Sequence, residues 1–364
     1  MIRKLYVDLS VLAPGMGGVA IYAVELAREL AARFECEVVV PSYWSHPFPK
    51  SAVVPPPLAF RKSMISRRPG WRRAAGVRYG ADAFVYAPHM RGVLGAPHQA
   101  ITVHDIIHSV YPTRNAVENA YYSMILPRVL RQAELLLTVS RSSQSAIADL
   151  YDISPDKIRV VPNGIDLTQW KPRQDGDPMP QEGEYLLVVS ANRPYKNTVE
   201  LLQNHALWAG RYRLKIVSSK ARYGVTIRAA VAELGLQDRV DFEDGLSEQR
   251  LIALYQNASA IVYPSLIEGF GRPALEGMAV GRPVILSNIP PHVEVFGEAG
   301  ILITPGDQES WHHAFAALDN TEAAEGRRLR GLAIAARHSW AACADQLEQA
   351  LLECHPELAD LRIG

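Results

Sequence analysis

The feature that most constrains the fold is a rhythm of short apolar runs separated by helical patterns along the 364 residues. In the first half the runs are KLYVDL, CEVVV, AFVYA, AITVH, LLLTV and IRVVP, and in the second half they are YLLVVS, RLKIVS, RVDFE, AIVYPS and PVILS. Near-continuous Val, Ile and Leu runs are typical of strands in parallel sheets that helices cover on both faces. Between the first two runs, Val19, Ala23, Leu26 and Leu30 lie at helical spacing. The sequence therefore predicts an α/β fold.

The length of the chain predicts two domains, because one hydrophobic core rarely serves so many residues. The segment TQWKPRQDGDPMPQEGE, residues 168–184, is rich in Pro, Gly and charge and has no period, so it is the predicted linker. Residues 1–167 and 185–339 are then two doubly wound, Rossmann-like domains, and a helix at about 340–364 is expected to pack back on the first. The carboxyl ends of the two sheets should face each other across a cleft, where such sheets bind ligands.

Composition excludes several classes of protein. The formal net charge is zero, so the molecule as a whole should not attract nucleic acid. The three cysteines have no CxxC spacing, which fits a reducing compartment and excludes a zinc knuckle built on cysteines. The start MIRKLYVDLS has no sustained apolar region, and no run reaches the roughly 18–20 apolar residues that span a bilayer. We therefore expect a cytoplasmic protein.

The stretch EGFGRPALE, residues 268–276, carries two carboxylates around a glycine-rich bend. It follows the predicted strand AIVYPS and leads into the predicted helix PALEGMAV, where Pro273 suits the first helical position. The amides before that helix should be unpaired and able to bind a phosphate. Glu268 and Glu276 are suited to accept hydrogen bonds from vicinal hydroxyls, one pair on a sugar and one on a ribose. The predicted donor-binding residues of this loop are Glu268, Gly269, Phe270, Gly271, Arg272 and Glu276.

Two cations stand at the same predicted sheet edge. Arg193 and Lys196 lie in SANRPYKN, directly after the strand YLLVVS. They could neutralise a diphosphate as it leaves, a stabilisation that grows in the transition state. Beside the two glutamates, this pair indicates a site for a nucleotide sugar.

A second glycine-rich stretch, PGMGGVAIY, formally matches the dinucleotide fingerprint at Gly15, Gly17 and Ala20. A dehydrogenase would place an acidic residue at the end of the next strand, whereas Glu37 lies at its beginning. A ligand-free turn is another interpretation. We favour the hypothesis that Gly17 and Gly18 let the chain pass close to a substrate or phosphate at a helix N-terminus.

Several further residues are candidate site residues. His104 and Asp105, with His108 beyond them, could form a metal site, but a strand-end histidine is more often a structural or substrate contact, so no metal is predicted. His89 and Asp105 are low-ranked candidates for contact with an acceptor. The acidic pair of DGD, residues 175–177, has no strand before it and is interpreted as a turn.

Residues 61–78, RKSMISRRPGWRRAAGVR, hold seven basic residues, no acidic ones and a tryptophan. The simplest interpretation is a solvated face. The functional alternative is contact with anionic lipid headgroups or a lipid diphosphate, with Trp71 at the interface.

Taken together, these motifs resemble those of the retaining glycosyltransferase family 4, which has the two-domain GT-B fold. HDIIHSVYP is similar to the family's HD-containing loop, VVPNGID to the motif that ends the first domain, and RPYKN to its basic loop. VYPSLIEGFGRPALEGMAVGRPVILSNIP is similar to its E-x7-E signature and the strand that follows. The resemblance covers nearly the whole chain.

The resemblance implies roles for individual residues. Glu268 would bind hydroxyls of the transferred sugar, and Glu276 the ribose. Arg193 and Lys196 would hold the diphosphate, and His104 would lie beside the sugar. Gly17 and Gly18 would border the phosphate and acceptor. Many members carry an arginine immediately before the lysine, where this chain has Tyr195.

The function implied is metal-independent, retaining transfer of a hexosyl or deoxyhexosyl group, with mannose from GDP-mannose as the donor hypothesis. The acceptor would be a glycan or a lipid-linked saccharide in surface polysaccharide synthesis, and the protein would be cytoplasmic or peripheral at the inner face of the membrane. No cofactor is expected. The alternatives are a nucleotide-sugar epimerase or hydrolase of similar fold and a non-catalytic nucleotide-sugar-binding scaffold.

Overall fold

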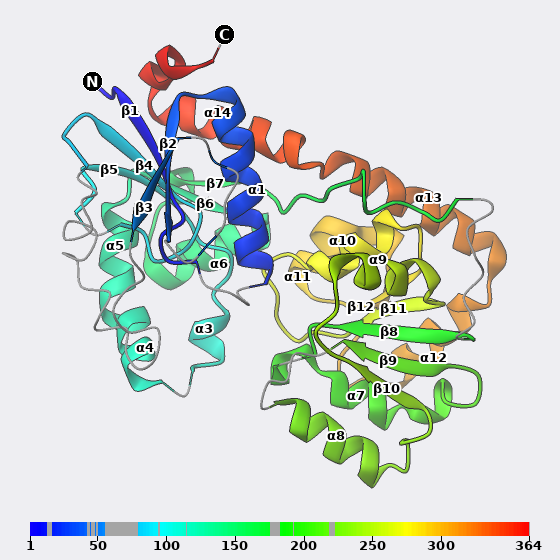
Figure 1. Cartoon of the computed structure of the whole chain (residues 1–364). Coiled ribbons are helices and arrows are strands. Elements are labelled where there is room, and N and C mark those ends of the chain that lie inside the picture. Colours follow the sequence, from blue (N-terminus) through cyan, green and yellow to red (C-terminus); the bar gives the residue numbers. More distant parts are fainter. Residues whose placement is uncertain are drawn as a thin grey trace. The chain divides into compact units, whose positions relative to one another are not determined.

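The computed structural model describes residues 1–12, 17–41, 44, 48, 50–54, 79–93, 95–113, 115–174, 183–191, 193–217 and 223–363. The chain divides into two compact units, Met1–Gly164 with Trp340–Gly364, and Ile165–Ser339. Each unit contains one parallel sheet with helices packed on it (Figure 1). The predicted α/β class is confirmed.

The first unit is built on a seven-stranded sheet in the order β3-β2-β1-β4-β5-β6-β7. Its central strands are buried along their whole length, as predicted for strands covered on both faces. The strands are β1 Lys4–Asp8, β2 Cys36–Pro41, β3 Ser51–Val54, β4 Ala83–Ala87, β5 His98–Thr102, β6 Leu135–Thr138 and β7 Ile158–Val160. The helices are α1 Gly18–Arg33, α3 Ile107–Val110, α4 Ala116–Ala120, the π-helix η2 Tyr121–Ile125, α5 Leu126–Gln132, α6 Arg141–Tyr151, η3 Pro155–Lys157, α14 Trp340–Cys354 and η7 Pro356–Leu361.

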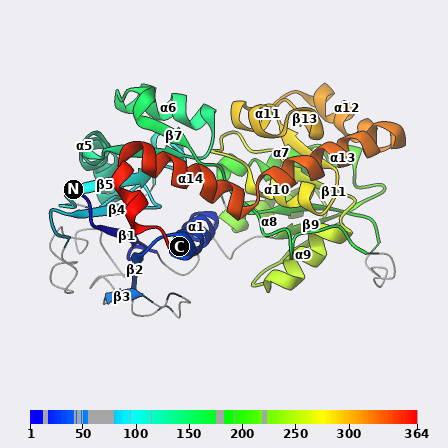
Figure 2. The ribbon, with the colours of Figure 1, turned by 90° about the horizontal axis from the view of Figure 1, so that it is seen from above.

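The second unit has a six-stranded sheet in the order β10-β9-β8-β11-β12-β13. Its core contains two fully buried tryptophans, Trp208 and Trp311. The strands are β8 Tyr185–Val189, β9 Arg213–Val217, β10 Val240–Glu243, β11 Ala260–Tyr263, β12 Val284–Ser287 and β13 Ile301–Ile303. The helices are η4 Pro194–Lys196, α7 Thr198–Gln203, η5 His205–Leu207, α8 Tyr223–Glu233, α9 Glu248–Asn257, α10 Arg272–Ala279, α11 Pro290–Phe296, η6 Gly297–Ala299, α12 Gln308–Leu318 and α13 Thr321–Arg337. Helix α10 packs against α13 (Figure 2).

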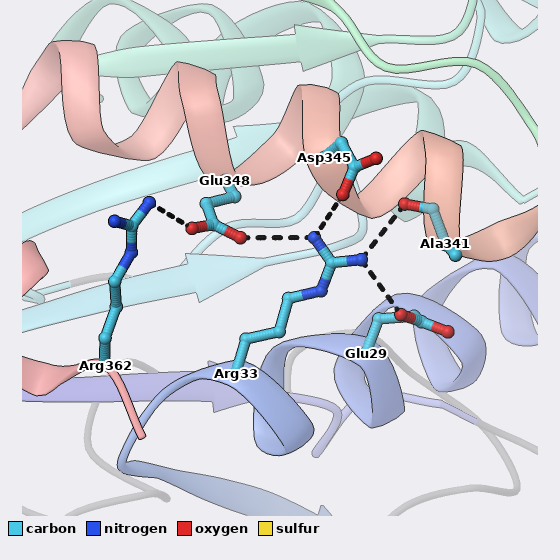
Figure 3. A network of polar contacts seen from close by, with 6 residues as sticks. All are labelled: Glu29, Arg33, Ala341, Asp345, Glu348 and Arg362. Atoms are coloured by element: carbon cyan, nitrogen blue, oxygen red, sulfur yellow. Dashed lines mark hydrogen bonds and ion pairs between the residues drawn. The ribbon is translucent and has the colours of Figure 1, made fainter. Parts of the chain in front are cut away.

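The C-terminal segment belongs to the first unit, where α14 lies beside α1. Arg33 at the end of α1 places Nη1 2.6 Å from Asp345 Oδ1 and 3.1 Å from Glu348 Oε2 (Figure 3). Its Nη2 lies 3.2 Å from Glu29 Oε2, and Arg362 also pairs with Glu348. A network of charged side chains therefore joins α1 to the C-terminal segment within this unit.

Of the predicted linker, the structure describes residues 168–174 and 183–184. Trp170 is buried and meets the ring of Tyr255 edge-on, with ring centroids 5.2 Å apart. Arg173 Nη1 donates to Asn257 Oδ1 at 3.1 Å. This part of the segment packs on the second unit. The DGD turn, 175–177, lies outside the described residues.

Two strands of the structure, β3 and β13, were not predicted from the sequence. Both are short apolar runs of four and three residues, too brief to show a period. Among the described residues, no helix has both the length and the apolar character needed to cross a membrane. The basic segment 61–78 lies outside the described residues, so its predicted membrane contact remains a prediction.

Candidate functional site

The loop that carries the two glutamates joins β11 to α10. Strand β11 ends at Tyr263, and α10 begins at Arg272, so Pro273 is the second helical residue rather than the first. Gly271, just before the helix, has a φ of 110°. Residues with a side chain rarely adopt this backbone conformation. A Cβ there would also lie 3.0 Å from His292 Cδ2 and from Phe296 Cε2. Backbone and packing both require glycine at this bend.

Glu268 is the centre of a compact polar cluster. Its Oε1 accepts hydrogen bonds from Lys196 Nζ at 2.6 Å and from the Tyr263 hydroxyl at 2.6 Å. Lys196 Nζ also donates to the Tyr263 oxygen at 2.7 Å, so the three groups form a closed triangle. The side chains of Lys196 and Glu268 are only 12% and 8% exposed. The sequence prediction that Lys196 lies close to the acidic loop is therefore met for Glu268.

The charge of Glu268 is stabilised by its partners. Burial alone would raise the pKa of the carboxyl group, but the Lys196 ammonium and the Tyr263 hydroxyl outweigh burial and leave the pKa below its usual value. Burial and the adjacent Glu268 charge hold the pKa of Tyr263 well above its usual value. Glu268 is thus an anion and Tyr263 a neutral donor at neutral pH. Such a carboxylate still has free lone pairs for a ligand's hydroxyl groups.

Glu276 forms a second, separate cluster. Its Oε2 accepts from the Tyr255 hydroxyl at 2.8 Å, and its Oε1 accepts from Arg272 Nη2 at 2.9 Å. Burial, reinforced by the Glu276 charge, holds the pKa of Tyr255 well above its usual value. Arg272 Nη1 is buried with no hydrogen-bond partner among the described residues. The guanidinium thus contributes to this site beyond the backbone amide that the sequence analysis considered.

The two predicted cations are placed differently. Lys196 ends η4 and reaches Glu268, whereas Arg193 precedes η4 and is exposed. In the described part of the chain, no carboxylate pairs with Arg193. Of this pair, the structure shows an ion pair with the acidic loop for Lys196, and none for Arg193 among the described residues. The predicted role of Arg193 on a diphosphate remains a prediction.

The remaining residues of the loop, Gly269, Phe270 and Gly271, are buried. The side chain of Phe270 is buried, and its ring contacts those of Phe296 and His338 at centroid distances of 5.8 and 5.6 Å. Only its backbone could meet a ligand.

His292 is a residue that the sequence analysis missed. It is fully buried, and its Nδ1 lies 3.0 Å from the Ser287 carbonyl oxygen at the end of β12. Its Nε2 has no partner within the described residues, and its ring centroid lies 5.5 Å from that of Tyr263. Burial lowers the pKa of His292, so the ring is neutral. The signal available was the sequence NIPPH, which follows a strand at the same sheet edge. Tyr263 and Tyr255 were likewise not identified.

In the first unit, α1 begins at Gly18, and Gly17 is its N-cap with φ of 58°. A Cβ at Gly17 would have nothing within 4 Å, so the backbone conformation rather than crowding favours glycine there. Within the described chain, no side chain caps this helix and its first turn carries no acidic residue. The first amides of this 16-residue helix could donate hydrogen bonds to an anion, and the predicted contact of Gly17 and Gly18 with a phosphate or substrate remains a prediction.

His104 lies two residues beyond β5, and is buried. Its Nε2 lies 3.2 Å from the Pro88 carbonyl oxygen, and its ring meets Tyr22 edge-on at 4.7 Å. Burial lowers the pKa of His104 to about 4, so the imidazole is neutral at neutral pH. A neutral ring suits the predicted place beside a sugar, which remains a prediction.

His89 and Asp105 have structural partners in this unit. His89 is buried, and its Nε2 lies 3.1 Å from the Asp8 carbonyl oxygen. The Asp105 carboxylate accepts from the Ile107 amide at 2.9 Å, at the start of α3. Contact of either residue with an acceptor remains a prediction. In the described part of the chain, His104, Asp105 and His108 do not gather as metal ligands.

Residues 16–169 match the family described as Glycosyltransferase Family 4, and residues 173–330 match Glycosyl transferases group 1. The O-antigen chain mannosyltransferase RfbU of Salmonella typhimurium is 34% identical over 217 residues, which are 60% of this chain and 60% of that protein. That match spans less than two thirds of the relative. The GDP-mannose:cellobiosyl-diphosphopolyprenol alpha-mannosyltransferase of Xanthomonas campestris is 30% identical over 275 residues, 72% of this chain and 69% of that one.

Among solved structures, sucrose-phosphate synthase from Thermosynechococcus elongatus resembles this chain with a TM-score of 0.79. The two are 19% identical, and the match covers 98% of this chain and 100% of that one. A likeness at this identity establishes the fold. The predicted GT-B fold class is confirmed.

Proposed function

Because the chain belongs to the family-4 glycosyltransferases, we propose that it transfers a hexosyl or deoxyhexosyl group from a nucleotide diphosphate sugar to a glycan or lipid-linked acceptor. The observation that carries this proposal is the triangle of Lys196, Glu268 and Tyr263. It holds a carboxylate in its charged form next to an ammonium group, at a bend where backbone amides precede a helix. Sugar hydroxyls and a diphosphate need these two kinds of partner side by side.

The roles follow from the chemistry of each group. Glu268 would accept hydrogen bonds from hydroxyls of the transferred sugar, each contributing on the order of 1.5–3 kcal/mol. Lys196 would turn toward the departing diphosphate, whose negative charge grows during transfer. The Tyr263 hydroxyl would then keep its hydrogen bond to Glu268, which stays ionised while Lys196 contacts the diphosphate. Glu276, with Arg272, would hold the ribose.

The finer proposal for the donor is mannose from GDP-mannose. The names of the two relatives described above support it, since both are mannosyltransferases and one names GDP-mannose. Retention of configuration is proposed through front-face displacement, in which the acceptor hydroxyl and the leaving phosphate share one side of the sugar. A phosphate oxygen would take the proton, so neither a protein base nor a metal is required.

The acceptor is proposed to bind the first unit. That unit has a pocket of about 590 Å³, lined in part by His108, Tyr122 and Tyr151. His108 Nε2 lies 2.7 Å from the Tyr151 hydroxyl, and its ring centroid is 4.2 Å from that of Tyr122. Aromatic faces with a few polar groups suit a saccharide or a lipid-linked saccharide. Synthesis of a surface polysaccharide, at the inner face of the membrane, is the proposed setting.

The test is a transfer assay with purified protein and a panel of GDP- and UDP-sugars, with a polyprenyl-diphosphate saccharide as acceptor. We expect transfer from GDP-mannose, an α-linked product by NMR, and unchanged rates in EDTA. The test variant is Glu268→Gln, which keeps the shape of the side chain but removes its charge and should lose most turnover. Full activity of that variant would contradict the proposal. Epimerised or hydrolysed sugar formed without acceptor would favour the epimerase or hydrolase alternative, and donor binding without any product would favour the scaffold.

A further inference from the structure

Three side chains gather at one end of the first unit's sheet. His98 is the first residue of β5, Glu134 immediately precedes β6, and His355 immediately follows α14. His98 Nδ1 lies 2.7 Å from Glu134 Oε1, and His355 Nε2 lies 2.5 Å from Glu134 Oε2. The ligand atoms of the three residues all lie within 4.8 Å of one another. Among the described residues, this is the one group of three or more such side chains.

Two imidazoles and a carboxylate are a ligand set that Zn²⁺ prefers. With Zn–N and Zn–O bonds near 2.0–2.2 Å, ligand atoms in a tetrahedral site lie about 3.3 Å apart. The two histidine nitrogens lie 2.7 and 2.5 Å from the carboxylate oxygens, so an ion would replace the shared protons and each of these pairs would part to about 3.3 Å. The side chains of His98, Glu134 and His355 are 33%, 35% and 17% exposed, which gives an ion access from solvent.

The surroundings hold the His355 ring in place. The ring packs edge-on against Phe84 in β4, with centroids 4.9 Å apart. Its second nitrogen, Nδ1, lies 3.6 Å from Glu357 Oε1. A carboxylate facing the free nitrogen of a metal-bound histidine is a recurrent arrangement, because it orients the ring and raises its basicity.

We propose that His98, Glu134 and His355 bind one Zn²⁺ or a similar transition-metal ion that fastens the C-terminal segment to the sheet. The site lies where β5 begins, whereas His104 follows the end of that strand, so the ion has no part in sugar transfer. It would supplement the Arg33 network, which anchors α14 on α1 (Figure 3). Glu134 lies 36 positions from His98 and 221 from His355 in the sequence, so the three residues form no motif, and no metal was predicted there.

The test separates a metal site from a plain hydrogen-bonded network. Full-length protein is stripped with EDTA and titrated with Zn²⁺ by calorimetry, and with Co²⁺ by visible absorption. We expect one ion per chain, a tetrahedral Co²⁺ spectrum and a higher Tm with Zn²⁺. His98→Asn keeps a hydrogen-bond donor but should lose binding at least tenfold, whereas His98→Cys keeps a metal ligand and should retain it. His313→Ala, at a histidine 77% exposed on α12, is the matched control and should bind as wild type does.

Circular dichroism of each variant checks folding. If His98→Asn or His98→Cys does not fold, His355→Cys against His355→Asn repeats the comparison at a second ligand. The proposal is overturned if the stripped protein binds no Zn²⁺, or if His98→Asn and His355→Asn bind it as tightly as wild type. In either case the three residues form a hydrogen-bonded network only.

Discussion

The pairing of Lys196 with Glu268 can be tested by a double-mutant cycle. The variants Lys196→Met and Glu268→Gln remove one charge each, and the double variant removes both. Since the two side chains are only 12% and 8% exposed, each single change leaves a charge in a site that water hardly reaches. Breaking a buried pair costs about 3–5 kcal/mol. Tyr263 still bonds the remaining partner, so we expect the lower end, about 3 kcal/mol.

The double variant should lose less unfolding free energy than the two single variants lose in sum, because it leaves neither charge buried without its partner. We expect a coupling free energy of about 1.5–3 kcal/mol. Urea unfolding followed by fluorescence measures each free energy, and each single variant should lower Tm by about 6–12 °C for a unit of this size. The matched control is the double-mutant cycle of Arg211 with Glu184. Arg211 Nη2 lies 3.0 Å from Glu184 Oε1, and the two side chains are 52% and 54% exposed. Its coupling should stay below about 1 kcal/mol.

The predicted coupling is refuted if the losses of unfolding free energy from Lys196→Met and Glu268→Gln add up to that of the double variant within about 0.5 kcal/mol, as they do for independent sites. The pH dependence gives a second check. Because the folded-state pKa of Glu268 is lowered, its stabilisation is present above the unfolded value of about 4.3 and is lost as pH falls through the folded value. The stability gap between wild type and Glu268→Gln should therefore narrow on acidification below about pH 4.3. A gap that widened there would contradict the lowered pKa.

Three further predictions concern single residues. Tyr255→Phe should lower the free energy of unfolding by about 1.5–3 kcal/mol and weaken binding of the nucleotide sugar, because Glu276 loses the hydrogen bond from the Tyr255 hydroxyl at 2.8 Å. Chemical unfolding measures the first effect and a binding titration the second. An unchanged free energy of unfolding would exclude a stabilising bond between Tyr255 and Glu276. Gly271→Ala should destabilise the protein by at least about 1 kcal/mol more than Gly297→Ala. Both glycines have a positive φ, but only the Cβ added at position 271 would crowd its neighbours. Equal Tm values for the two variants would therefore refute the packing argument. The imidazole of His104 should titrate near pH 4 by NMR, and a midpoint near 6.5 would show that the ring is solvated.

Much of the fold was predictable because its signals are local. The strands and the bend at residues 268–276 each depend on fewer than ten successive residues, so apolar runs, glycines and a proline identify them. The same is true of the proximity of Lys196 to Glu268, since both follow strands of one parallel sheet. The bonds inside the site were not predictable in this way. Tyr263 closes the triangle and Tyr255 binds Glu276, yet nothing in their sequence distinguishes them from other tyrosines at strand and helix ends.

The sequence by itself determined the α/β class, the division into two parallel sheets and the acidic loop between β11 and α10, because hydrophobic period and turn residues act over short distances. Only the tertiary structure decided which partners the charges take. Lys196 reaches Glu268 while Arg193 stays exposed, and His355 meets Glu134 across 221 positions. Hydrogen bonds act over about 3 Å, so their partners are set by where packing places distant segments.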